Sequence, residues 1–114
     1  MITIDKLKAF GADTEDALER CMGNETLYLK LIGKCLEDPS FEALDSAVSC
    51  GDLAGAFELA HSLKGVLGNL SLTPLYAPVS EMTEILRKGE SAGLKSLMSE
   101  LIAQRDELLR LFDA

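Results

Sequence analysis

The hydrophobic pattern of the chain is helical along its whole length, and it is clearest between residues 52 and 70. At about 100° of rotation per helical residue, the apolar positions of this stretch cover one continuous arc. That arc consists of Leu53, Gly55, Ala56, Leu59, Ala60, Leu63, Val66, Leu67 and Leu70. The pattern predicts a helix with this face buried. His61, the single histidine of the chain, lies near the centre of the opposite arc and is therefore expected to face solvent.

A second helical pattern precedes this stretch and is interrupted by a proline. Asn24 is a suitable N-cap for residues 25–37. Their apolar stripe consists of Leu27, Tyr28, Leu31, Ile32 and Cys35. Another stripe runs from Phe41 to Val48, but on a helix continued through Pro39 it would point to nearly the opposite side. We therefore expect a break or a strong kink at Pro39.

Two further helices are predicted after the histidine-bearing stretch. The first is expected to be capped by Ser71 or Thr73, to carry Pro74 in its first turn, and to end in a basic turn before Gly89. The second spans about residues 92–112. Both repeat apolar residues at intervals of three and four, which is typical of amphipathic helices.

The remaining pattern defines the fold class. Residues 2–10 and a segment that ends near Arg20 predict two short helices, and no segment alternates with the period of a strand. Short connections at Gly51 and Gly89 make neighbouring helices antiparallel. The sequence predicts an all-α fold, an antiparallel up-and-down four-helix bundle with the short N-terminal helices packed at one end. We expect residues 1–114 to form one domain.

Composition narrows the classes of function. The net charge of −8 and the pI near 4.5 argue against binding to nucleic acid or to an anionic membrane. The chain has no apolar run of membrane-spanning length, and its first residues lack the order of a signal peptide, so we expect a cytoplasmic protein. We also expect a monomer. Cys21, Cys35 and Cys50 are an odd number of widely spaced cysteines, which predicts buried or partly buried reduced thiols.

The outer face of the histidine helix has unusual neighbours around His61. Gly65 follows it by one turn and Gly68 by two turns. Each glycine inside a helix costs roughly 0.5 to 1 kcal/mol relative to alanine, so their presence calls for a reason other than helix stability. Missing side chains let another surface approach, and Lys64 places a cation on the same side. The other candidate partner-binding residues on this face are Ala54, Phe57 and Glu58.

The run His61-Ser62-Leu63-Lys64-Gly65, followed by Asn69-Leu70, resembles the signature of histidine-containing phosphotransfer (HPt) domains. The resemblance covers roughly residues 24–90, and it departs from the family at Ser71, where glycine is frequent. It implies a small helical bundle that carries a phosphoryl group on an exposed histidine and acts as a phosphocarrier without autonomous catalysis. By resemblance, His61 is the phosphorylated residue, Lys64 is the cation near the phosphoryl group, and Gly65 is the small residue under the docked partner.

The resemblance also implies the partners. These are receiver domains of response regulators, with a hybrid sensor histidine kinase as a further candidate. The receiver would supply its aspartate, a magnesium ion and a lysine, so no cofactor or metal site is expected in this chain.

Three alternatives concern the same histidine. The chain could be a helical adaptor that docks through the same face without phosphate chemistry, or a hydrolytic enzyme with His61 as general base, although no second catalytic group is visible nearby. A zinc site lacks a second histidine. Phe57 fits a core-edge aromatic and a docking anchor equally well.

Overall fold

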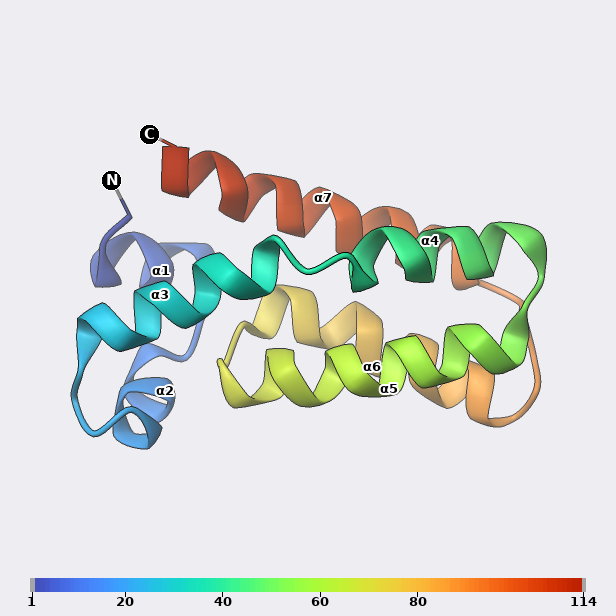
Figure 1. The fold of residues 1–114 in the computed structure, drawn as a ribbon, viewed down its shortest axis with the longest axis horizontal. Coiled ribbons are helices and arrows are strands. Elements are labelled where there is room, and N and C mark those ends of the chain that lie inside the picture. Colours follow the sequence, from blue (N-terminus) through green and yellow to red (C-terminus); the bar gives the residue numbers. More distant parts are fainter. Residues whose placement is uncertain (1, 114) are drawn as a thin grey trace.

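The computed structural model describes residues 2–113, and every regular element within them is an α-helix (Figure 1). The elements are α1 (Ile4–Phe10), α2 (Thr14–Arg20), α3 (Glu25–Leu36), α4 (Ser40–Cys50), α5 (Leu53–Asn69), α6 (Thr73–Arg87) and α7 (Leu94–Asp113). The predicted all-α class is confirmed. None of these helices is both long enough and apolar enough to cross a membrane.

The two short N-terminal helices begin and end at local signals. The Thr3 side chain accepts a hydrogen bond from the Lys6 amide at 3.2 Å, and Gly11 ends α1 with a φ of 117°. Asp13 caps α2 by accepting from the Asp16 amide, also at 3.2 Å. Both helices lie at the end of the molecule where α3 begins and α7 ends, as expected (Figure 1).

The predicted interruption at Pro39 is a full break between two helices. The helix α3 ends at Leu36, and α4 begins at Ser40 with Pro39 in the N-cap position. Since proline has no amide hydrogen, it cannot continue the hydrogen-bond ladder of α3. The Ser40 amide instead donates to the Asp38 carboxylate at 2.8 Å, which satisfies one amide of the new helix.

The helices α4, α5, α6 and α7 form the predicted four-helix bundle. They run up and down in turn, and α5 packs on α4 and α6 while α7 packs on α6 and α4 (Figure 1). The core contains fully buried side chains from all four, among them Phe41, Leu44, Leu67, Leu75, Met82 and Leu101. Within this bundle, α5 has one face against its neighbours and one face toward solvent.

The predicted buried stripes were wrong at three positions on α3 and α5. Leu27, Leu31 and Val66 are 41 %, 39 % and 44 % exposed. The helix α3, which precedes the break at Pro39, packs on α2 and α7. A surface pocket lined by Leu31 and Val66 remains between α3 and α5. Leu53, Gly55 and Leu59 are only half-buried, so the covered arc of α5 is narrower than its apolar arc.

Two smaller expectations were also wrong. Neither Ser71 nor Thr73 caps α6, because Leu72 occupies the N-cap position without a side-chain hydrogen bond and Ser71 belongs to the preceding turn. All three cysteines are free thiols, but Cys50 is exposed rather than buried, since it lies at the last turn of α4 beside the loop. Burial raises the pKa of the Cys35 thiol to about 11, which keeps it protonated.

Candidate functional site

The histidine-bearing helix α5 begins at a tight cap. Gly51 ends α4 in the left-handed region with a φ of 79°, and the Asp52 carboxylate accepts a hydrogen bond from the Gly55 amide at 3.0 Å. The carboxylate folds back so closely over Gly55 that a β-carbon there would collide with it. The cap fixes the first turn of the helix, and a side chain at Gly55 would require the Asp52 carboxylate to shift.

His61 lies nearly two turns beyond Gly55 on α5 and is exposed, as predicted. Its ring stacks with that of Phe57, with ring centroids 5.8 Å apart and an angle of 16° between the planes. The Arg87 guanidinium of α6 lies over the Phe57 ring, 5.4 Å from its centroid, and its Nε donates to Glu84 Oε2 at 3.1 Å. The sequence placed Phe57 near His61 on one helix, but it gave no sign of Arg87.

The two glycines that follow His61 differ in their surroundings. A β-carbon at Gly65 would have no atom within 4 Å, so this position is open on its outer side. A β-carbon at Gly68 would lie 3.1 Å from Cε1 of Tyr76, whose ring comes from α6. Gly68 thus makes room for an aromatic ring of the same chain, whereas the space over Gly65 is unfilled.

Two surface pockets adjoin this face of α5. One, of about 300 Å³, is lined by His61, Lys64, Gly65, Gly68, Asn69 and Tyr76 and is called here the His61 pocket. The other, of about 340 Å³, is the Phe57 pocket, lined by Leu53, Ala54, Phe57, Glu58, Leu86, Arg87 and Gly89. Every residue predicted for the site therefore lies on α5 and lines one of these two pockets. Sequence reasoning missed Tyr76 and Arg87, both on α6.

Two polar groups beside the open Gly65, the His61 ring and the Lys64 ammonium, have no polar partner in the part of the chain that the structure describes. Across residues 2–113, neither Lys64 nor the His61 ring forms a hydrogen bond or an ion pair. Nor do the same residues contain a group of three or more histidine, cysteine or acidic side chains that could hold a metal ion. The arrangement offers a nucleophilic ring and one cation to an incoming molecule.

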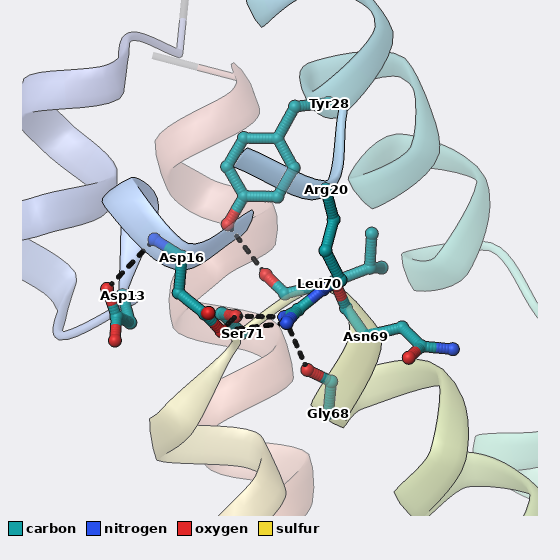
Figure 2. Close-up of polar contacts among 8 residues, drawn as sticks. All are labelled: Asp13, Asp16, Arg20, Tyr28, Gly68, Asn69, Leu70 and Ser71. Carbon is teal, nitrogen blue, oxygen red and sulfur yellow. Dashed lines mark hydrogen bonds and ion pairs between the residues drawn. The ribbon is translucent and has the colours of Figure 1, made fainter. Parts of the chain in front are cut away.

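Side chains of α2 and α3 form hydrogen bonds with the C-terminal end of α5 and the turn after it (Figure 2). The Arg20 guanidinium of α2 donates to the carbonyl oxygens of Gly68 at 3.1 Å and Asn69 at 3.0 Å, and to the Ser71 hydroxyl at 2.5 Å. That hydroxyl donates to Asp16 at 2.9 Å, and Asp16 also pairs with Arg20 at 2.9 Å. We call these contacts, together with Tyr28, the α5 clasp.

Tyr28 is the buried member of the α5 clasp. Its hydroxyl donates to the Leu70 carbonyl at 2.7 Å, and its side chain is fully buried (Figure 2). Burial raises the pKa of the Tyr28 hydroxyl to about 12, so it remains a donor throughout the physiological range. The clasp provides donors to the carbonyls of Gly68, Asn69 and Leu70, while the Val66 and Leu67 carbonyls accept from backbone amides of the following turn.

Ser71 shows how the turn after α5 tolerates a serine. Its φ is 53°, in the left-handed region where glycine is favoured. The two hydrogen bonds of its hydroxyl, from Arg20 and to Asp16, offset the cost of this conformation. Ser71 therefore adopts a backbone conformation that glycine would favour at this position.

Comparison with known proteins assigns the family. A search of curated proteins and a search of solved structures found no match to this chain. The family model described as Hpt domain matches residues 5–113, essentially the whole chain. Together with the all-helical bundle, this match shows that the chain belongs to the Hpt domain family.

Proposed function

We propose that this protein is a phosphorelay intermediate that accepts a phosphoryl group on His61 from the aspartate of one receiver domain and donates it to another. Its family is one of phosphotransfer domains. The observation that carries the assignment to His61 is its setting, since the only histidine of the chain is exposed and faces the His61 pocket beside the open space over Gly65.

The chemistry suits a neutral imidazole. A ring nitrogen forms the N–P bond with its lone pair while the P–O bond of the acyl phosphate breaks, and the carboxylate leaves with that electron pair. The ring becomes a phosphoimidazolium, which can release its N–H proton to water. Onward transfer reverses these events, because the N–P bond then breaks toward a second carboxylate and the lone pair returns to the ring.

The neighbours of His61 have separate proposed roles. The Lys64 ammonium, which lines the same pocket, neutralises charge on the phosphoryl oxygens. Gly65 lets the partner's backbone or side chains reach His61, since nothing lies over it. Ala54, Glu58 and Gly68, which line the two pockets beside His61, belong to the surrounding docking face.

The phosphoryl donors and acceptors are proposed from the family. Hpt domains interact in general with receiver domains and with kinases, so a receiver would bring the aspartate and its metal ion. This chain would act as a monomeric carrier in the cytoplasm, with no catalytic machinery beyond the residues on α5.

The direct test is labelling by a phosphorylated receiver domain. The wild-type chain is expected to take up acid-labile phosphate, and His61→Gln is expected to take up none while keeping its helical content and its affinity for the receiver. Transfer would be followed by gel autoradiography, and binding by titration of the unphosphorylated receiver. Undiminished acid-labile labelling of the variant would exclude His61 as the acceptor.

The adaptor alternative predicts a different pair of results. Neither protein would take up label, and His61→Gln would keep full partner binding and biological effect. In this alternative the partner docks on the same face of α5, at the His61 and Phe57 pockets, without phosphate chemistry.

A further inference from the structure

The stack of Phe57 on His61 suggests a role for Phe57 that differs from docking. We propose that Phe57, held by Arg87, is a positioning residue that fixes the plane of the His61 imidazole and thereby raises the rate of phosphoryl transfer. This inference rests on the proposed function of His61. It replaces the two interpretations that the sequence left open, a core-edge aromatic and a docking anchor.

The first observation is the geometry of the two rings. Phe57 and His61 are four residues apart on α5, and their rings are nearly parallel, at 16°, with centroids separated by 5.8 Å. Side chains at this spacing lie one above the other on a helix, and aromatic pairs prefer offset parallel arrangements at such separations. The stack is the only interaction found for the His61 ring within residues 2–113.

The second observation is that α6 holds the Phe57 ring. The Arg87 guanidinium lies 5.4 Å from the ring centroid, and its ion pair with Glu84, at 3.1 Å, restrains it on α6. Phe57 is half-buried and lines its pocket together with Arg87. Contacts from two helices therefore restrict the orientation of the Phe57 ring, and through the stack they restrict that of the exposed imidazole.

Orientation matters because phosphoryl transfer requires the attacking nitrogen to lie in line with the bond that breaks. An exposed histidine without a stacking partner would populate several side-chain rotamers, and only some of them would aim the nitrogen at the incoming phosphorus. Prior selection of one rotamer lowers the entropy lost on reaching the transition state. The benefit would appear in the rate of the bound complex rather than in its affinity.

The test compares Phe57→Leu with Phe57→Tyr. We expect Phe57→Leu to lower the single-turnover transfer rate at saturating phosphorylated receiver by about tenfold, with the half-saturating concentration unchanged. Phe57→Tyr retains the ring and should retain the rate. A spectroscopic readout is independent of transfer: the C–H proton resonances of the His61 ring should lose the ring-current shift of Phe57 in the leucine variant and keep it in the tyrosine variant.

Two further variants complete the experiment. Phe112→Leu removes another half-buried phenylalanine, at the far end of α7, and should change neither readout. Arg87→Met removes the guanidinium from an exposed position, so it carries the same test if Phe57→Leu fails to fold. It should produce a smaller loss of rate and a partial change of the His61 resonances.

Several results would overturn the inference. An unchanged saturated rate or unchanged His61 resonances in a folded Phe57→Leu protein would do so. If Phe57→Leu does not fold, the same results in Arg87→Met would overturn the inference. A rise in the half-saturating concentration of the receiver without a change in the saturated rate would make Phe57 a docking anchor instead. If the wild-type chain takes up no label, the proposed function itself fails, and the wild-type measurement identifies that case before any variant is compared.

Discussion

The outer face of α5 and its C-terminal end use polar side chains in opposite ways. At the face, His61 and Lys64 have no hydrogen bond or ion pair with the residues that the structure describes, and the space over Gly65 is unfilled. At the C-terminal end, Arg20 and Tyr28 bind the last carbonyls of the helix. The same helix therefore has one region whose polar groups are hydrogen-bonded within the chain and one where His61 and Lys64 form no such bond with the described residues.

The two glycines Gly65 and Gly68 show the same contrast within one turn of helix. Gly68 is explained by the chain itself, because the Tyr76 ring occupies the place of its side chain. Gly65 has no such neighbour, and in the proposed function its glycine gives up helix stability for access by the partner. The comparison separates a glycine that the packing of Tyr76 requires from one for which only the proposed transfer gives a reason.

Gly65 gives the largest expected effect. Gly65→Arg should reduce transfer by at least about a hundredfold, because the long side chain occupies the path of the partner, while the free energy of unfolding stays equal or rises by up to about 1 kcal/mol. Transfer from a phosphorylated receiver and chemical denaturation measure the two properties. The matched control is Gly65→Ala, which should keep most of the transfer. Normal transfer by a folded Gly65→Arg protein would contradict the proposed approach over this position.

Tyr28 tests the opposite region. Tyr28→Phe leaves the buried Leu70 carbonyl without its donor, so we expect a loss of about 1 to 3 kcal/mol in the free energy of unfolding, with transfer by the folded protein unchanged. Urea denaturation at neutral pH measures this loss. A fall in the transfer rate comparable to that of Gly65→Arg would show that the α5 clasp is not separate from the site.

The stability difference between the wild type and Tyr28→Phe should depend on pH, and the raised pKa of Tyr28 gives the direction. The pKa of Tyr28 is raised to about 12 in the folded protein from an ordinary value of 10.0, so the contribution of Tyr28 is complete below pH 10 and is lost as pH rises from 10 to 12. The stability advantage of the wild type over Tyr28→Phe should therefore shrink across that interval. Taking the difference between the two proteins removes the parallel effect of Cys35, whose pKa is raised to about 11.

Substitutions at Ser71 are expected to give the smallest change in stability. They separate the contribution of the hydroxyl hydrogen bonds from the cost of the left-handed backbone conformation. Ser71→Ala loses both hydroxyl hydrogen bonds and keeps a side chain in the left-handed region, whereas Ser71→Gly loses the bonds and relieves the backbone. We expect the glycine variant to exceed the alanine variant in stability by about 1 kcal/mol, as thermal unfolding would measure. Equal stabilities would mean that the backbone conformation carries no cost there.

Local signals were sufficient to predict most of the helices. The Asp52 cap, the Pro39 break and the position of His61 on the outer face depend on residues a few positions apart, and the structure contains all three. A helical wheel also predicts which side chains share a face. It does not predict which part of an apolar face a neighbouring helix covers, and for that reason Leu31 and Val66 were assigned to the core but are exposed.

The sequence by itself determined that the chain is a helical bundle with an exposed histidine beside a cation and an open glycine, because periodicity and capping act within a few turns. Only the tertiary structure decided what holds that histidine and that helix. Arg87 meets Phe57, Tyr76 meets Gly68, and Arg20 meets Ser71 across different helices. These contacts depend on how each helix is rotated and spaced against its neighbours, which is a property of the packed bundle.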